Sequence, residues 1–354
     1  MIRRHQTGIA LITVLLILAL ATVAAVSMTS RQQLDIRRTS NILKIEEGYM
    51  ALLAAEEFAK RVLIWDFREI PKINSRVNTI TDGHGDIWKS PFLDSAKQTL
   101  GNFEVVNFKF VDLQGRFNLN NLIDANQNPS QADLAAFQRL LHEKGLPDSL
   151  ANVAVDWIDA NTDTYQSGAE DTAYQTLKQP YVPPNKPMAS ASEMNRLMTV
   201  NLAGEEDYDK SSKTRRKYIR DMLHKEDNQV LTALPKRTEI NVNSAASPAI
   251  FQMLVPGLEY DKAETMFNEI RVGPGQEPLF QNANDFWNYP AVKAVGIKQD
   301  KRMPITFSSE YFLFSAEAIS GDLVVYCNTI FHRTGGTSPS VEVVHRSYGK
   351  KGEI

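Results

Sequence analysis

The sequence has only one cysteine, and its first 70 residues contain no proline and few glycines. Its single cysteine, Cys327, excludes a disulfide within the chain, and we expect a small buried hydrophobic side chain there. The first proline is Pro71, and the only glycine between Ile9 and Ile70 is Gly48. Because proline and glycine are the usual helix breakers, these absences allow one uninterrupted N-terminal helix.

Catalytic and nucleotide-binding signatures are also missing. The chain has no G-x-S-x-G elbow, P-loop, H-E-x-x-H pattern or glycine-rich dinucleotide loop. Its six histidines are scattered and never paired at metal-ligand spacing. The net charge of −3, from 39 basic and 42 acidic residues, provides no general attraction for nucleic acid. The sequence therefore predicts a protein that is not an enzyme and has no nucleic-acid partner.

A long apolar run occupies residues 9–26 and contains no charge. At ~1.5 Å per residue its length is near the lower limit for a transmembrane helix. Arg3, Arg4 and His5 precede it, and basic residues before a span predict a cytoplasmic N-terminus. We expect residues 9–30 to cross the membrane once and the rest of the chain to lie on the other side.

Two other interpretations of this run are a cleaved secretory signal and a buried helix of a soluble domain. Ala21 and Ala25 offer small residues for a signal cleavage site, whereas a run that is apolar on every face fits a soluble helix poorly. The apolar spacing then continues at Ile42, Ile45, Tyr49, Leu52, Ala59 and Leu63. A signal peptide does not predict this continuation, so we expect one helix over residues 9–65.

Strand signals lie at two places that a long helical region separates. Runs rich in β-branched and aromatic residues predict strands over residues 103–112, 311–319, 323–333 and 341–348. Helical patterns between them cover residues 132–144, 149–159, 192–200, 213–231 and 260–270. The expected fold is α+β: a long helix and a small antiparallel sheet form a head, with a large inserted all-α domain over residues 118–302. Residues 31–117 begin the head and residues 303–354 complete it.

Two similar tetrapeptides indicate a repeat inside the expected insert. Residues 117–120 read Phe-Asn-Leu-Asn and residues 240–243 read Ile-Asn-Val-Asn. Each precedes a helix, a turn that contains Gly145 or Gly257, and a second helix. This order predicts a duplicated helical hairpin.

The turn at Gly257 also looks like half of a helix-hairpin-helix motif, whose backbone amides bind phosphate. A membrane-anchored nucleic-acid-binding protein, as in DNA uptake, is therefore the alternative function. Glu259, Asp261 and Glu264 surround this turn and would repel phosphate. A structural hairpin is the preferred interpretation.

An acidic loop over residues 156–171 has the spacing of a calcium site. Asp159, Asn161 and Asp163 match positions 1, 3 and 5 of a twelve-residue calcium loop, and Glu170 matches position 12. Asp171 adds a further carboxylate. Hard oxygen ligands at this spacing suit a structural Ca²⁺, although Thr164 replaces the usual glycine. Spacing alone leaves a solvated acidic loop, with Asp159 capping a helix, equally open.

The N-terminal arrangement resembles the type IV pilins and the pseudopilins of type II secretion. A short basic leader over residues 1–8 ends in Gly8, and an apolar half-helix and an amphipathic half-helix follow. The resemblance implies that a prepilin peptidase cuts after Gly8 and that Ile9 becomes the N-methylated first residue. Most members have Glu at the fifth mature position, where this chain has Thr13. That departure is typical of the minor pseudopilin K (general secretion pathway protein K) family.

Further segments are similar to the same family. They are Gly-Arg-Phe-Asn-Leu-Asn-Asn-Leu at residues 115–122, Asp-Trp-Ile-Asp at 156–159, Gly-Ala-Glu-Asp at 168–171 and the second tetrapeptide at 240–243. The resemblance implies calcium in the acidic loop, an inner-membrane anchor and a periplasmic globular part. It implies a position at the pseudopilus tip and a role in starting assembly for the export of folded proteins. The implied partners are the I-type and J-type minor pseudopilins, the major pseudopilin, the prepilin peptidase and the inner-membrane assembly platform.

Overall fold

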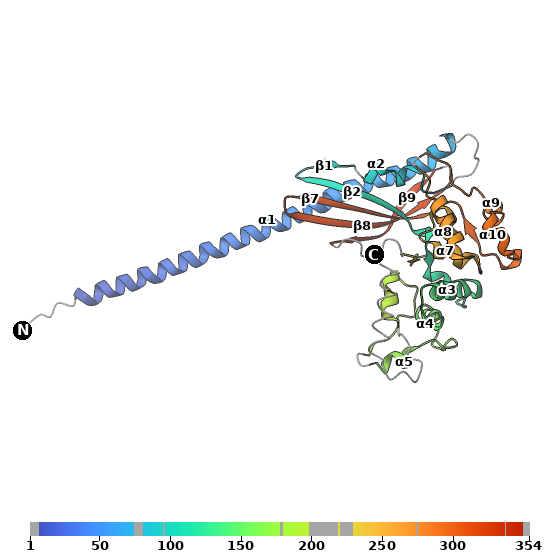
Figure 1. Ribbon diagram of the computed structural model, residues 1–354. Helices are drawn as coiled ribbons and strands as arrows, with labels where there is room; N and C mark the ends of the chain where they lie inside the picture. Colours follow the sequence, from blue (N-terminus) through green and yellow to red (C-terminus); the bar gives the residue numbers. More distant parts are fainter. Residues whose placement is uncertain are drawn as a thin grey trace, which may run out of the picture.

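One helix dominates the computed structural model, which describes residues 7–73, 81–94, 96–177, 180–197, 219, 229–273, 275–336 and 338–349. Helix α1 (Thr7–Ile73) is 67 residues long, and its first half projects away from the rest of the molecule (Figure 1). The predicted helix is confirmed, but it continues past Trp65 and includes Pro71. Val62, Leu63 and Asp66 near this end are buried.

The second half of α1 lies on a five-stranded antiparallel sheet. The strands are β1 (Gln98–Leu100), β2 (Phe103–Asp112), β7 (Tyr311–Ser320), β8 (Leu323–Thr334) and β9 (Ser340–Tyr348), in the order β1-β2-β7-β8-β9. The four predicted strands are confirmed, and so is the pilin-like α+β fold class. The prediction missed β1, which is too short to carry a pattern.

One hydrophobic core fills the space between α1 and the sheet. Leu52, Ala59 and Leu63 of α1 pack there with Phe103 of β2 and Phe312 of β7. Gly48 is placed where a Cβ atom would lie 2.9 Å from Cγ2 of Val325. Only glycine therefore allows α1 to approach β8 this closely. Cys327 of β8 is buried in the same core, as the sequence predicted.

A second hydrophobic core holds the helices that follow β2. These are α3 (Gln131–Glu143), α4 (Ser149–Ile158), α5 (Asp171–Gln175), α7 (Pro248–Leu254), α8 (Tyr260–Glu269), α9 (Ala283–Trp287) and α10 (Pro290–Val295). Phe137, Trp157 and Phe251 lie in this core. The chain leaves the sheet after β2 and returns to it at β7 (Figure 1).

Two of the predicted helices differ from the structure. Residues 191–196 form a 3₁₀ helix (Ala191–Arg196) rather than an α-helix over 192–200, of which residues 198–200 lie outside the described part. The helix predicted over residues 213–231 is wrong at its end, because Leu231 belongs to strand β4 (Leu231–Thr232). The remainder of that prediction, apart from helical Ile219 and residues 229–230, also lies outside the described residues. Pairing with β3 decides the conformation of Leu231, and local helical spacing cannot predict such a contact.

The tetrapeptide repeat has the same geometry at both positions. Strand β3 (Phe117–Asn118) pairs in parallel with β4, and β5 (Ile240–Asn241) pairs in parallel with β6 (Ile305–Thr306). The second asparagine of each repeat then holds both backbone groups of one distant residue. Asn120 accepts from the N–H of Met188 at 2.8 Å and donates to its carbonyl at 2.9 Å. Asn243 binds Phe280 in the same way, at 3.1 and 2.7 Å.

The helices after each tetrapeptide form matching hairpins. Gly145 between α3 and α4 has φ 68°, and Gly257 between α7 and α8 has φ 91°. Both turns need the left-handed conformation that glycine adopts without strain. The predicted duplication is therefore confirmed: α3 and α4 form one helical hairpin, and α7 and α8 form the other.

Candidate functional site

A cluster of buried carboxylates lies at the end of α4. One carboxylate oxygen from each of Asp156, Asp159 and Glu170 lies within 4.8 Å of the other two. All three side chains are buried. Three negative charges held this close without a counter-charge repel one another strongly, so the arrangement requires protons or a cation.

Several oxygens of this cluster have no hydrogen-bond donor among the described residues. They are Oδ2 of Asp156, Oδ1 of Asp159 and both carboxylate oxygens of Glu170. Burial raises the pKa of Asp156 to about 7, and the neighbouring charge of Asp159 adds to this shift. Burial and then the charges of Asp156 and Asp159 raise the pKa of Glu170 to about 7. Buried acceptor oxygens without donors are costly, and a hard cation would satisfy them together.

The local chain conformation positions these carboxylates. Asp156 and Asp159 are three residues apart at the end of α4, so they lie on the same side of the helix. The backbone N–H of Tyr165 donates to Oδ1 of Asp156 at 2.9 Å, which leaves Oδ2 turned toward the cluster. A Cβ atom at Gly168 would lie 2.1 Å from that Oδ2. Glycine at this position therefore provides the room for the cluster.

The structure brings together only part of the predicted calcium ligand set. Asp159 and Glu170 lie in the cluster, whereas Asp163 is exposed and outside it, and exposed Asn161 only borders it. The amide of Asn161 instead donates to Oδ2 of Asp159 at 2.9 Å and accepts from the N–H of Asp163 at 2.7 Å. Asp171 has an unpartnered Oδ1 but does not belong to the cluster.

Sequence reasoning missed Asp156 as a potential ligand. In the twelve-residue calcium loop, Asp159 is the first ligand, and Asp156 lies before it. The helical spacing of Asp156 and Asp159 was the signal that could have identified the pair. The order of the twelve-residue template is therefore not the geometry that the chain adopts.

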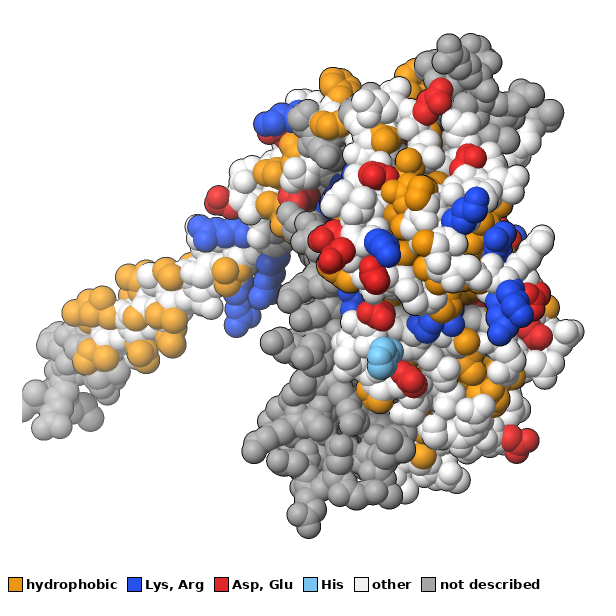
Figure 2. Space-filling model, turned by 45° about the vertical axis from the view of Figure 1, so that its right-hand side comes forward, with side chains coloured by type: hydrophobic (Ala, Val, Ile, Leu, Met, Phe, Trp, Pro, Cys, Tyr) orange, Lys and Arg blue, Asp and Glu red, His pale blue; other side chains and the backbone are white. Residues whose placement is uncertain are grey.

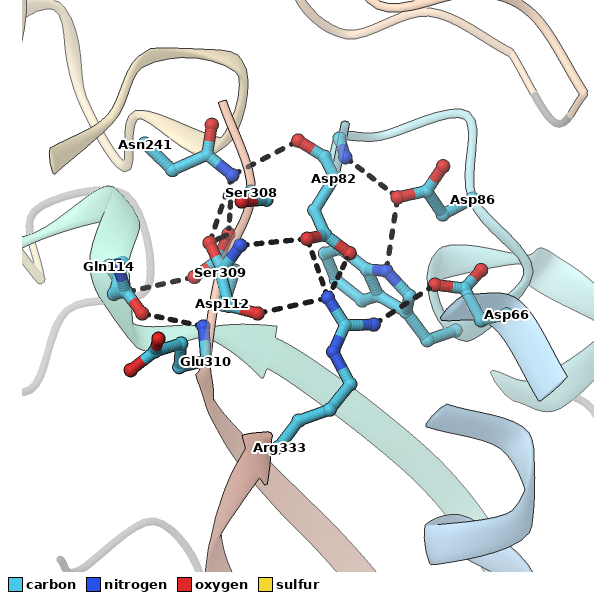
Figure 3. Close-up of polar contacts among 12 residues, drawn as sticks. Asp66, Asp82, Asp86, Asp112, Gln114, Asn241, Ser308, Ser309, Glu310 and Arg333 are labelled. Atoms are coloured by element: carbon cyan, nitrogen blue, oxygen red, sulfur yellow. Dashed lines mark hydrogen bonds and ion pairs between the residues drawn. The ribbon is translucent and has the colours of Figure 1, made fainter. Parts of the chain in front are cut away.

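A second buried charged cluster centres on Arg333 of β8 (Figure 3). Its Nη2 donates to Asp82 at 2.5 and 2.6 Å and to the carbonyl of Ser309 at 2.9 Å, and its Nη1 lies 3.3 Å from Asp66. Asp86 stands beside this group and accepts from the N–H of Gly83 at 2.8 Å and the indole of Trp88 at 3.1 Å. Since a guanidinium already occupies the centre, this cluster is an ion-pair junction rather than a cation site.

This junction connects the head to the inserted helices. Asp112 at the end of β2 accepts from the hydroxyl of Ser309 at 2.6 Å and from the amide of Asn241 at 3.1 Å. Asn241 also donates to the carbonyl of Asp82 at 3.0 Å. The first asparagine of the second repeat is thus part of the same polar network, and a scan for metal or catalytic motifs does not detect it.

The N-terminal residues singled out by the sequence lie on the projecting part of α1. Gly8 is within the helix, and the side chain of Ile9 lies outside the described part. Thr13 is exposed, and its hydroxyl donates to the carbonyl of Ala10 at 2.9 Å. This helix is the one described helix that is long and apolar enough to cross a membrane.

The helical hairpin at Gly257 carries acidic groups at its second helix. Glu259 precedes α8 and pairs with Lys262 at 3.0 Å, and Asp261 lies in the first turn. These carboxylates already occupy the positive end of the helix that a phosphate would require. The geometry therefore agrees with a structural hairpin.

Comparisons with known proteins agree with this fold. The family model described as "Type II secretion system (T2SS), protein K" matches residues 115–210. The type II secretion system protein K of Pseudomonas aeruginosa is 29% identical over 359 residues, covering 99% of this chain and 95% of the relative. That of Aeromonas hydrophila is 33% identical over 215 residues, covering 56% and 60%.

A solved structure has the same overall arrangement. It belongs to the GspK-GspI-GspJ complex from the type 2 secretion system of enterotoxigenic Escherichia coli, and it superimposes with a TM-score of 0.66. The identity is 17%, over 89% of this chain and 100% of the other. With a pilin-like head and an inserted pair of helical hairpins, this chain is similar from end to end to relatives named type II secretion system protein K.

Proposed function

We propose that this protein is a minor pseudopilin that forms or caps the tip of a type II secretion pseudopilus. It would help to start assembly for the export of folded proteins. The similarity to the protein K relatives and the fold support this proposal. The observation that carries it is a second apolar surface on α1, which the described part of the chain leaves largely exposed.

This second surface is a stripe of exposed hydrophobic residues. Ile36, Leu43 and Met50 follow one another at intervals of seven residues, and Phe58 and Trp65 repeat the interval. At about 100° per residue these side chains share one side of the helix, nearly opposite the row that packs on the sheet. A seven-residue interval is the period at which helices pack side by side in a coiled coil.

The partners that fit the stripe are N-terminal helices of other pseudopilins. A partner anchored in the same membrane in the same orientation would present its helix parallel to α1. The solved relative was crystallised as a complex with GspI and GspJ. We therefore infer that the I-type and J-type minor pseudopilins contact this stripe, with the major pseudopilin below them and the assembly platform in the inner membrane.

Thr13 and the insert support a position at the tip. The hydroxyl of Thr13 is satisfied within its own helix, so this position needs no positive partner from a subunit above. A Glu there would need the N-terminal amine of a neighbour. The inserted helices extend the head well beyond the sheet, which would block further subunits from stacking above it (Figure 1).

One pair of variants tests the proposed contact surface. Leu43 and Ile42 are adjacent on α1 and each is 60% exposed, but only Leu43 lies in the stripe. Leu43→Glu should weaken co-purification with the I-type and J-type proteins about tenfold, because it places a charge in a helix contact. Ile42→Glu adds the same charge on another side and should leave co-purification unchanged. Equal effects of the two variants would reject the stripe as the contact surface.

We further propose processing and topology in keeping with the family. Cleavage after Gly8 would leave Ile9 as the methylated first residue, with the N-terminus cytoplasmic and the head periplasmic. The apolar helix supports the membrane anchor, and the similarity to the protein K relatives supports its orientation. A mature mass that begins at residue 9 with one added methyl group would support it, and a start near residue 26 would reject it.

We also propose that the cluster of Asp156, Asp159 and Glu170 holds a structural calcium ion. Its unpartnered buried oxygens and the space that Gly168 leaves beside them support this proposal. The ion would supply positive charge and oxygen coordination where the chain offers only acceptors. The three carboxylates would then hold the end of α4 against the start of α5, which orders the long loop between them.

A further inference from the structure

Four basic residues follow the apolar run on α1: Arg31, Arg37, Arg38 and Lys44, here called the basic collar. All four are exposed, and none forms an ion pair with a described residue. Asp35 is the only acidic residue between positions 29 and 45. Figure 2 shows blue side chains after the largely orange first part of the projecting helix. The collar therefore places unpaired positive charge beside the expected membrane span.

The distance from the span suits contact with lipid headgroups. If the span ends at residue 30, a rise of ~1.5 Å per residue places Arg31 ~2 Å, Arg38 ~12 Å and Lys44 ~21 Å beyond the hydrocarbon core. Lys44 is therefore the outermost member of the collar and comes within reach only when its side chain extends toward the membrane. The headgroup layer on one side of a bilayer is ~5–7 Å thick. Electrostatic attraction reaches a further ~8 Å at physiological ionic strength. Long basic side chains can also extend along the helix toward the interface.

The angular distribution of the collar fits a surface that surrounds the helix. Arg31 and Arg38 are seven residues apart and share one side, whereas Arg37 and Lys44 share another side about 120° away. A partner helix would contact one stripe only. The apolar stripe that contains Ile36 and Leu43 lies on a third side, so the collar leaves it free for helix packing.

We propose that the basic collar binds anionic phospholipid headgroups and thereby sets the depth of α1 in the membrane. This proposal rests on the membrane anchoring proposed above. Charge complementarity identifies the occupant, because guanidinium and ammonium groups bind phosphate.

The experiment uses the full chain reconstituted in phosphatidylcholine bilayers that contain a minor fraction of phosphatidylglycerol. Electron paramagnetic resonance of spin-labelled lipids measures the preference of the protein for each lipid at its surface. Wild type should prefer phosphatidylglycerol several-fold at low salt, and this preference should decrease in high salt. The double variants Arg31→Gln/Arg38→Gln and Arg37→Gln/Lys44→Gln should each lower it about twofold or more.

The chain offers a matched control on the same helix. Arg61 and Arg68 are exposed and also seven residues apart, but ~45 Å or more beyond the span by the helical rise. Arg61→Gln/Arg68→Gln should leave the lipid preference unchanged. An unchanged preference in both collar variants would overturn the proposal. Loss of co-purification with other pseudopilins, at unchanged lipid preference, would overturn it in favour of an acidic protein partner. Failure of wild type to float with vesicles of either composition would instead reject the membrane anchor itself.

Discussion

Arg333 donates from one nitrogen, Nη2, to both carboxylate oxygens of Asp82, at 2.6 and 2.5 Å. Both side chains are only 1% exposed, and 251 positions of sequence separate them. The pair joins β8 to the segment that follows α1, and Asp66 brings the end of α1 itself to the same guanidinium. The stability of the junction between helix, sheet and insert therefore depends on one buried cation.

Removal of that cation should destabilise the protein strongly. Arg333→Met leaves the carboxylates of Asp82 and Asp66 buried without a cation, which should cost about 3–5 kcal/mol in the free energy of unfolding. Chemical denaturation of the full chain in detergent measures the loss. Lys97→Met provides the control, because the Lys97 side chain is 68% exposed and its pair with Glu104 at 3.1 Å lies at the surface. That control should change stability by no more than about 0.5 kcal/mol. A similar small change in Arg333→Met would contradict the assigned role.

Asp86 should make stability fall as the pH rises. Burial, with the charges of Asp66 and Asp82, raises the pKa of Asp86 to about 9, and no described cation contacts it. Its carboxyl group therefore binds a proton more tightly in the folded than in the unfolded chain. The stability that this proton provides is complete below pH ~4 and is lost as the pH rises toward 9.

Asp86→Asn should remove this dependence, because the amide keeps an acceptor for Gly83 and Trp88 without a charge. Relative to wild type, the variant should gain at least ~1 kcal/mol between pH 5 and pH 8. Unfolding is measured at both values in saturating calcium, so that the carboxylates of the Asp156 cluster remain ligated. Asp300→Asn, at an exposed position, serves as the control. Its stability should depend on pH in the same way as that of wild type. If the stability of Asp86→Asn also depended on pH in the same way as that of wild type, Asp86 would be ionised over the whole range from pH 5 to pH 8.

Glu56 should anchor α1 to the sheet as an ionised group. Arg346 of β9 donates to it from Nε at 2.7 Å and from Nη2 at 2.5 Å, and Thr329 of β8 donates at 2.9 Å. Burial alone would raise the pKa of Glu56, but the hydrogen bonds and charge of Arg346 outweigh it and lower the pKa below its ordinary value near 4.5. Its stabilising contribution is therefore present above pH ~4.5 and is lost as the pH falls through the lowered pKa.

Glu56→Gln should cost about 2 kcal/mol at pH 7, and the difference from wild type should shrink below pH 4. Its neighbour Glu57 gives a matched control, since that side chain is 64% exposed and pairs only with Lys60 at the surface. Glu57→Gln should cost no more than about 0.5 kcal/mol. Equal losses in the two variants would indicate that charge on the helix, rather than the buried contact, carries the effect.

Calcium removal should lower the melting temperature through Asp156. A chelator should reduce the melting temperature of the full chain in detergent by about 5 °C or more, because ligand binding stabilises the folded state. Asp156→Asn should melt at a lower temperature and no longer respond to the chelator. Gly168→Ala should behave in the same way, because the added methyl group would contact Oδ2 of Asp156.

Exposed Asp163 separates the observed cluster from the loop template. Asp163→Asn should keep the full response to the chelator, since Asp163 lies outside the cluster. Loss of the response in this variant would favour the twelve-residue template. A melting temperature that the chelator leaves unchanged in wild type would reject the calcium site altogether.

Local patterns were sufficient for the parts of this fold that local physics decides. The absence of proline before Pro71 and the spacing of Leu52, Ala59 and Leu63 indicated α1, and runs of β-branched and aromatic residues indicated β2, β7 and β8. The errors occur where distant segments meet. Leu231 lies in a strand because it pairs with Phe117. Pro71 is part of α1, in the last stretch of the helix after buried Asp66.

The candidate site shows the same division. Residues 156–171 were identified by composition, since a dense group of carboxylates is visible in any one-dimensional scan. The spatial set of ligands was not, because Tyr165 fixes one oxygen of Asp156 and Gly168 leaves room for the other. A template of sequence positions assumed one loop geometry, and the chain adopts another.

By itself, the sequence determined the class of the protein: a long N-terminal helix with an apolar start, a sheet interrupted by paired helical hairpins, and Thr13 in place of a carboxylate. Periodicity and composition encode these features within short stretches. Only the tertiary structure decided that Asp66, Asp82, Asp112 and Arg333 form one buried network and that Asp156 joins Asp159 and Glu170. Burial determines which charges must pair and which oxygens lack a donor, and burial arises only when segments far apart in the chain come together.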